Sequence, residues 1–307
     1  MIRLQKSTIV RLRNNAGQAF FRYGEHLAPG RVGRVALDLW FAAPPRMADL
    51  PVPDGGEPFE VLAEGHVVRG TVWGDGLDFA RPPTVYLVHG WGGRGSQFGA
   101  MVEPLVDAGH RVVMFDAPLH GESPHGPAGP RRTNGVEFAQ ALDAVFCRFG
   151  PAEAVIAHSM GTIATYLALR YGWLGTERLV LVAPMVHVTG LLDQFQAALG
   201  FGPRSRRALE RGIGTFVGVP VHDFDARLQS RHVDPVPTLV LTDRDDRQTP
   251  YDDVVSLADE LGVPLVTTDG LGHRKILRDP TVIATVLEFL TGEPARRIDS
   301  ELETSAS

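Results

Sequence analysis

From Thr84 onward, short apolar runs alternate with segments of helical pattern, and this alternation constrains the fold more than any other feature of the chain. Six runs have strand character: Thr84–Val88, Arg111–Phe115, Ala154–Ala157, Leu179–Val182, Thr238–Thr242 and Pro264–Thr268. Helical patterns lie between and after them, near 96–108, 135–149, 160–171, 252–261 and 281–291. Strands that are almost wholly apolar and separated by helices indicate a mostly parallel sheet covered on both faces. The sequence therefore predicts an α/β fold.

Three other regions depart from this alternation. Residues 1–55 have a helical pattern and end in a loop rich in proline and glycine, and we expect this leader to pack on the body. The alternating runs 59–63 and 66–73 predict an antiparallel pair at a sheet edge. Residues 185–235 lack a clear strand and contain helical stretches at Gly190–Leu199 and Ser205–Gly212. We interpret them as a helical cap inserted into a core of residues 56–184 and 236–291, and we expect the polar tail, 292–307, to be disordered.

Composition excludes several classes of partner. The net charge of −6 gives no basic surface, so nucleic acid is not expected as a partner. No apolar run approaches 18 residues, and the basic start of the chain, Met1 to Phe21, lacks the apolar core of a secretory signal. A membrane contact through that segment stays open, but packing on the body is favoured, and the cytoplasm is the default location. The single cysteine, Cys147, lies in an apolar helical pattern and is predicted to be a buried structural thiol.

A candidate nucleophile, Ser159, lies in Ala157-His158-Ser159-Met160-Gly161, between a strand and a helix. A serine hydroxyl needs a tight turn that exposes it beside a base, and small residues must lie two positions before and after it. Ala157 and Gly161 meet that requirement. The alternative is a serine that caps a helix after a strand. His158, next to the serine, is expected to point away from its hydroxyl.

A candidate base and a candidate acid follow the serine along the chain. His273 lies in Gly270-Leu271-Gly272-His273, after the last strand and before the last helix. Three acids, Asp243, Asp245 and Asp246, leave the strand Thr238–Thr242, and any of them could orient a histidine.

A glycine-rich turn, His89-Gly90-Trp91-Gly92-Gly93, ends the strand Thr84–Val88. We expect the backbone amides of Trp91 and Met160 to form an oxyanion hole. A phosphate-binding loop is the alternative, but the Gly-Lys-Ser/Thr sequence that it needs is absent. His120, in the turn after the next strand, is expected to have a packing role. The chain has no His-Glu-x-x-His sequence or cysteine–histidine cluster, so neither a metal nor a cofactor is expected.

These motifs resemble the α/β-hydrolase superfamily over roughly Phe59 to Leu290. The strings His89 to Arg94, His158 to Gly161 and Gly270 to Arg274 are similar to those of bacterial single-domain hydrolases. The resemblance implies an α/β-hydrolase fold with a helical cap and a triad of Ser159, Asp246 and His273 in the order nucleophile, acid, base. An acid, three residues and then a proline resembles the acid loop of that fold, which favours Asp246 over its neighbours. A serine nucleophile argues against the dehalogenase and epoxide hydrolase branches, which use aspartate.

The resemblance implies a carboxylesterase-like serine hydrolase that acts on a small-molecule ester through an acyl-enzyme. We expect a small or medium apolar substrate whose pocket includes Trp91, His158, Met185 and Phe195. A carbon–carbon bond hydrolase or a perhydrolase with the same triad is one alternative, because the fold hosts many reactions. A non-catalytic binding protein on the same fold is another. The oligomeric state stays open.

Overall fold

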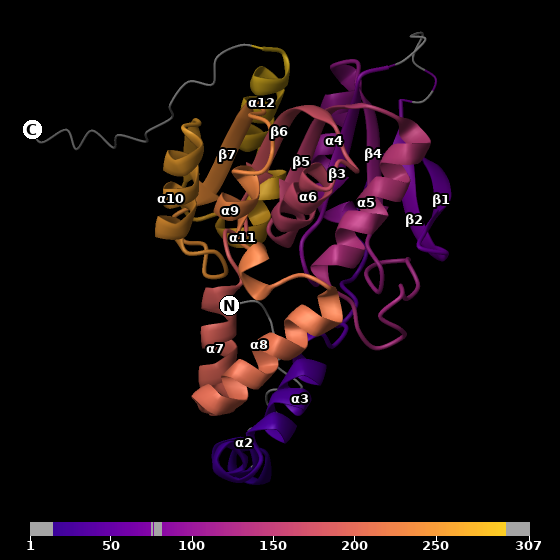
Figure 1. The fold of residues 1–307 in the computed structure, drawn as a ribbon. Coiled ribbons are helices and arrows are strands. Elements are labelled where there is room, and N and C mark those ends of the chain that lie inside the picture. The colour runs from indigo at the N-terminus through magenta and orange to yellow at the C-terminus, as the bar shows by residue number, and fades with distance from the viewer. Residues whose placement is uncertain (1–14, 75, 77–81, 293–307) are drawn as a thin grey trace, which may run out of the picture.

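An eight-stranded sheet forms the centre of the molecule in the computed structural model, which describes residues 15–74, 76 and 82–292 (Figure 1). The strand order is β1-β2-β4-β3-β5-β6-β7-β8. β1 pairs with β2, and β2 pairs with β4, in antiparallel fashion, whereas all other neighbours are parallel. The strands are Glu57–Ala63, His66–Trp73, Thr84–Val88, Arg111–Asp116, Ala152–His158, Thr176–Val182, Thr238–Asp243 and Leu265–Thr268. The predicted α/β class and the antiparallel edge pair are confirmed.

Helices cover both faces of this sheet and bury an apolar core on each. On one face, α5 (Gly135–Phe149), α6 (Met160–Arg170) and α10 (Tyr251–Leu261) contribute side chains such as Phe138, Ile163 and Val254 to the larger core. On the other face, α4 (Gly99–Asp107) and α12 (Pro280–Leu290) contribute Met101 and Val282 to the smaller one. Because both faces are covered, β3 and β7 are buried along their whole length, which explains why apolar residues predominate in their sequences.

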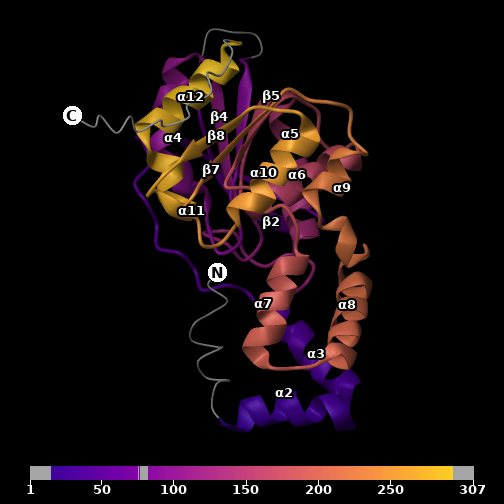
Figure 2. The ribbon, with the colours of Figure 1, turned by 90° about the vertical axis from the view of Figure 1, so that its left-hand side faces the viewer.

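The region between β6 and β7 is helical, as the sequence predicts. It contains α7 (Thr189–Leu199), α8 (Pro203–Val217), the 3₁₀ turn η2 (Val221–Asp223) and the short helix α9 (Ala226–Ser230). α7 and α8 extend away from the sheet at the carboxyl ends of its parallel strands. Two helices of the N-terminal segment, α2 (Asn15–Leu27) and α3 (Pro29–Trp40), lie against them (Figure 2). The N-terminal segment thus contacts the inserted helices, and its first 14 residues lie outside the described part of the chain.

Short helical turns complete the chain. η1 (Gly95–Phe98) precedes α4, while α11 (Gly272–Lys275) and η3 (Ile276–Arg278) lead into α12. The sequence pattern does not predict α11, and the disorder expected for the tail concerns residues 293–307, which are not described. Within the described ranges, no helix has the length and apolar character needed to cross a bilayer.

The prediction that Cys147 is buried is wrong. Its thiol is exposed, and Sγ lies 3.6 Å from Asp143 Oδ1 on the outer side of α5. The buried side chains of that helix, among them Phe138, Leu142 and Val145, form one stripe toward the sheet. Cys147 is two positions after Val145, which turns it about 200° away from that stripe.

Candidate active site

Ser159 lies in a sharp turn between β5 and α6 and has φ 54° and ψ −120°, a conformation that strains a residue with a side chain. The turn is held by its backbone: Ser159 N–H donates to Val182 O at 3.2 Å, and Ser159 O accepts from Met185 N–H at 3.1 Å. A Cβ atom at Gly161 would come within 2.4 Å of Val88 O, so only glycine fits there. The structure therefore forms the kind of elbow that presents a serine hydroxyl at the carboxyl end of a strand.

His273 lies in α11 and forms a hydrogen bond with Asp246, which follows β7. The distance between His273 Nδ1 and Asp246 Oδ2 is 2.7 Å, and both side chains are almost fully buried. Asp246 also accepts from Gln248 N at 2.7 Å and from Thr249 Oγ1 at 2.7 Å. Burial opposes the charge of Asp246, but the hydrogen bonds with His273, Thr249 and Gln248 outweigh it and lower the pKa of that carboxyl. An ionised Asp246 keeps the proton of His273 on Nδ1 and leaves Nε2 free to accept another.

The two competing acids hold the loop on which His273 lies. Asp243 Oδ2 accepts from Thr268 Oγ1 at 2.8 Å and from Leu271 N at 2.9 Å. Asp245 Oδ2 accepts from Gly270 N at 3.2 Å. Their carboxylates are thus committed to the loop that precedes α11, and Asp246 is the acid that reaches the histidine.

His158 connects the elbow to His273. Its Nε2 lies 2.8 Å from the carbonyl oxygen of His273, and the centroids of the two rings are 4.6 Å apart. Burial lowers the pKa of His158 well below its usual value, so the ring is neutral and Nε2–H donates to that carbonyl. This contact brings His273 beside the turn that contains Ser159.

The glycine-rich turn after β3 passes over the elbow. A Cβ atom at Gly90 would lie 2.7 Å from Ser159 Cβ, so this position accepts only glycine without a shift. Gly92 N–H donates to His120 Nε2 and Gly93 N–H donates to Gly90 O, both at 3.0 Å. Among the hydrogen bonds of the described residues, none is donated by the amides of Trp91 or Met160. Both amides are therefore available to an oxyanion.

Two buried histidines fix this turn to the loop after β4. His89 Nε2 accepts from Ala117 N at 3.0 Å, and its Nδ1 lies 2.8 Å from Gly90 O. His120 Nδ1 lies 2.9 Å from Pro118 O, while its Nε2 accepts from Gly92. Burial lowers the pKa of His89, and it lowers the pKa of His120 to about 3, so each ring is a neutral donor and acceptor. His120, expected only to pack, positions the turn by a hydrogen bond.

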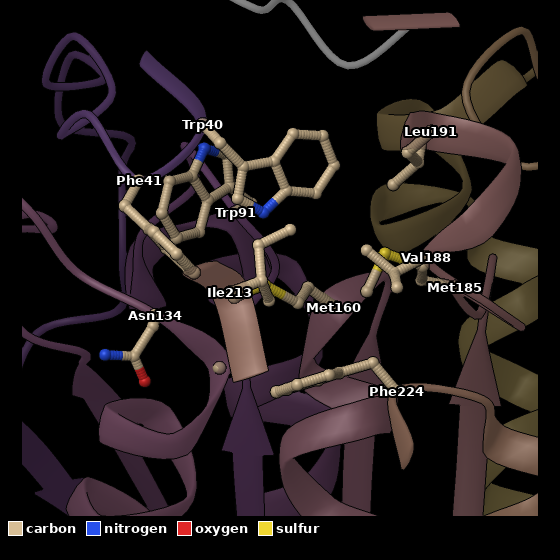
Figure 3. A pocket seen from close by; sticks show the side chains of 11 residues that line it. Trp40, Phe41, Trp91, Asn134, Met160, Met185, Val188, Leu191, Ile213 and Phe224 are labelled. Atoms are coloured by element: carbon tan, nitrogen blue, oxygen red, sulfur yellow. The ribbon is translucent and has the colours of Figure 1, made fainter. Parts of the chain in front are cut away.

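An apolar cavity opens beside the elbow (Figure 3). In Figure 3, Trp40, Phe41 and Trp91 lie on one side of it, and Met185, Val188 and Leu191 lie on the other. Asn134, Gly135, Met160, Ile213 and Phe224 complete the lining. Met160 follows Ser159 directly, and the Met185 amide donates to the Ser159 carbonyl, so two lining residues are next to the candidate nucleophile.

Of the four predicted pocket residues, two line the cavity and two do not. Trp91 and Met185 line the cavity, whereas the expectation for His158 and Phe195 is corrected, because neither belongs to the lining in the described part of the chain. His158 is occupied with His273, and Phe195 lies behind Trp40, with ring centroids 5.2 Å apart. Trp40 and Phe41 also line the cavity and were not predicted to do so. The only signal was an aromatic pair at the end of the leader helix, far from every motif.

The comparisons with known proteins agree with one another on the fold. A family model described as the alpha/beta hydrolase fold matches residues 83–210, and a model described as TAP-like protein matches residues 215–300. No curated protein matches the chain. Among solved structures, an esterase from Pyrococcus furiosus is 18% identical, covers 82% of this chain and 98% of its own, and has a TM-score of 0.61.

Two further structures are similar to the same extent. An esterase from Exiguobacterium antarcticum is 16% identical over 76% of this chain and 98% of its own, with a TM-score of 0.57. A thioesterase domain from the curacin biosynthetic pathway is 16% identical over 78% of this chain and 100% of its own, also with a TM-score of 0.57. At such identities the likeness concerns the fold.

Proposed function

We propose that this chain, to which the alpha/beta hydrolase fold model matches over residues 83–210, is a serine hydrolase of the α/β-hydrolase superfamily that cleaves carboxylic esters with small or medium apolar groups. The observation that carries the proposal is the 2.7 Å hydrogen bond between Asp246 and His273, next to a strained turn that presents Ser159. A solved esterase and a solved thioesterase domain with this fold support the reaction class.

In the proposed acylation step, Ser159 Oγ attacks the ester carbonyl carbon while His273 Nε2 takes the hydroxyl proton. Asp246 keeps the imidazole oriented and stabilises its positive charge. The carbonyl oxygen becomes an oxyanion that accepts from the amides of Trp91 and Met160, each such donor being worth about 3–4 kcal/mol in the transition state. The bond from the carbonyl carbon to the alcohol oxygen then breaks, and His273 gives its proton to the leaving alcohol.

In the proposed deacylation step, water replaces the alcohol. His273 Nε2 takes a proton from that water as its oxygen attacks the acyl-enzyme, and a second oxyanion forms between the same two amides. Collapse breaks the bond to Ser159 Oγ, which regains the proton from His273, and the carboxylic acid leaves. The apolar cavity beside Met160 suits an apolar substituent on the carbonyl.

The first experiment is intact-mass analysis after treatment with a fluorophosphonate, on the wild-type protein and on Ser159→Ala. We expect one adduct on wild type and none on the variant, with circular dichroism showing that both are folded. No adduct on folded wild type would contradict the proposal and favour a binding protein. Hydrolysis of aryl esters but not of vinylogous diketones separates an esterase from a carbon–carbon bond hydrolase, and an assay for peracid formation tests the perhydrolase.

A further inference from the structure

Two pairs of helices, here called the roof, pack against each other beside the sheet: α2 and α3 from the N-terminal segment, and α7 and α8 from the insertion (Figure 2). Of these, α3, α7 and α8 contribute Trp40, Leu191 and Ile213 to the lining of the cavity. α3 and α8 pack closely through glycines on both helices. A Cβ atom at Gly33 would lie 2.6 Å from Ala208 Cβ, and one at Gly212 would lie 3.0 Å from Leu37 Cδ2. Such close approach means that the two helices form one packed unit although they are distant in the sequence.

A buried carboxylate joins α2 to the start of α8. Glu25 accepts from Arg204 N at 2.7 Å and from Ser205 N at 2.9 Å, which satisfies amides that an α-helix leaves free at its N-terminus. Burial opposes the charge of Glu25, but the hydrogen bonds from Ser205 and Arg204 outweigh it and lower the pKa of Glu25. Phe21, which is also buried, contacts Phe201 with ring centroids 6.0 Å apart.

The end of α3 contacts both the inserted helices and the loop before α5. Trp40 packs edge-on against Phe195 of α7, and Phe41 lies 4.6 Å from Phe216 of α8, measured between ring centroids. The carbonyl of Phe41 accepts from Thr133 N at 3.2 Å, in the loop before α5. Two aromatic side chains from outside the family-matched region, 83–300, are therefore held in place at the cavity.

The lining of the cavity selects for an uncharged apolar group. It contains no charged side chain, and its one carboxamide, Asn134, uses its oxygen to accept from Val136 N and Glu137 N at the start of α5. The unfilled space measures about 80 Å³. Since one water-sized group requires roughly 10–15 Å³, the space is large enough for an apolar group bigger than a methyl.

The position of the cavity indicates which half of the substrate enters it. Trp91 and Met160, whose amides form the proposed oxyanion hole, line the cavity, while His273 and Asp246 do not, within the described part of the chain. The leaving group has to take a proton from His273 and therefore lies on the histidine side of Ser159. The cavity lies on the oxyanion side, where the acyl chain has to extend.

We propose that α3 is part of the substrate site, with Trp40 and Phe41 forming one wall of an acyl pocket for an uncharged, apolar chain. The inference rests on the proposed function of Ser159. Each methylene buried in such a pocket raises kcat/KM by about fourfold until the pocket is full. From the acetate ester upward, kcat/KM should thus rise by about fourfold per added methylene and then fall once the chain outgrows the pocket.

The test is kcat/KM for p-nitrophenyl esters from acetate to dodecanoate on wild type, Trp40→Ala and Trp173→Ala. Trp173 is a matched control, because its indole packs near Tyr171 at the opposite end of α6 from Met160. Trp40→Ala should move the preferred chain length upward by about two to four carbons, because it enlarges the pocket, whereas Trp173→Ala should leave it unchanged. Should Trp40→Ala fail to fold, Val188→Phe provides the opposite change, and it should move the preference toward acetate.

Two results overturn the inference. The first is a preferred chain length that Trp40→Ala and Val188→Phe leave unmoved, and the second is a preference for charged acyl groups. With fluorophosphonate labelling of Ser159 retained, either result leaves the proposed function in place and removes only the assignment of the pocket. Loss of labelling together with no hydrolysis of any ester is the separate failure of the proposed function itself.

Discussion

Two regions meet at the same cavity and are held by different forces. At the carboxyl ends of the parallel strands, here called the sheet edge, the candidate catalytic groups are fixed by buried polar contacts. Examples are Asp246 to His273 at 2.7 Å and Gly92 to His120 at 3.0 Å. In the roof, aromatic contacts and close glycine packing join the helices, together with the buried carboxylate of Glu25 and an ion pair between Arg206 and Asp193.

This difference assigns the chemical reaction to the sheet edge and the choice of substrate to the roof. Hydrogen bonds depend steeply on distance and angle, so the sheet edge fixes the position of each reacting group within narrow limits. Apolar contacts are not directional, so the roof can change the size and shape of the pocket while the reacting groups stay in place. Substitutions at the sheet edge should therefore lower kcat, while substitutions in the roof should change substrate preference or stability.

The largest effect is expected at the acid. Asp246→Asn should lower kcat/KM for a short ester by about 10⁴-fold, because an amide no longer holds His273 in the tautomer that accepts the serine proton. Asp245→Asn is the matched control, since the Asp245 carboxylate accepts from the loop amide of Gly270 and not from His273, and the variant should retain most activity. Steady-state kinetics on both variants check this, and equal losses would show that Asp246 has no special role.

A smaller effect is expected at the histidine that positions the oxyanion turn. His120→Phe removes the acceptor for Gly92 N–H and should lower kcat by about 10- to 100-fold with little change in KM, because the turn loses its alignment. His120→Gln offers an oxygen acceptor and should recover part of that loss. His125→Phe, at an exposed position, is the control. A change in KM alone would place His120 in substrate binding instead.

The buried histidines should also make the sheet edge sensitive to acid. Burial lowers the pKa of His89, His120 and His158, and that of His120 falls from 6.5 to about 3. The unfolded chain then binds more protons below pH 6.5, so stability present above pH 6.5 is lost as the pH falls toward 3. His120 alone should cost about 1.6 kcal/mol of unfolding free energy between pH 6.5 and pH 5.

Urea unfolding at pH 7.5, 6 and 5 measures this slope, and His120→Gln should reduce it. The roof responds in a lower range, because the pKa of Glu25 is lowered and its contribution persists until the pH falls below about 4.5. A stability that stays constant from pH 7.5 to pH 5 would contradict the assignment of neutral histidines to the sheet edge.

The smallest effect on activity is expected in the roof. Glu25→Gln weakens the cap of α8 and should lower the free energy of unfolding by about 1–2 kcal/mol, while hydrolysis of an acetate ester stays within about twofold of wild type. Hydrogen exchange should accelerate in α2 and α8 but not in β5. Glu177→Gln, at a side chain that is 77% exposed, is the control. Equal acceleration in β5 would show that the roof and the sheet unfold as one unit.

Local sequence patterns predict much of the fold. The helix predicted near 135–149 has those same bounds as α5, because Asn134 caps its start through Val136 and Glu137 and Gly150 ends it with φ 88°. The short helix α11 was missed, since its four residues are too few to show a period of 3.6. Cys147 was misassigned because apolar neighbours in the sequence do not reveal which side of the helix a residue occupies.

The sequence by itself determined the order of strands and helices, the elbow at Ser159 and the candidates for its acid and base. Those features depend on residues close together in the chain, where periodicity, glycine positions and caps act directly. The resemblance of its loop already favoured Asp246, but only the tertiary structure showed that its carboxylate, not that of Asp243 or Asp245, contacts His273. Likewise, only the tertiary structure placed Trp40 at the end of α3 in the lining of the cavity, because contacts such as Glu25 with Ser205 join residues 180 positions apart and depend on packing that no local pattern records.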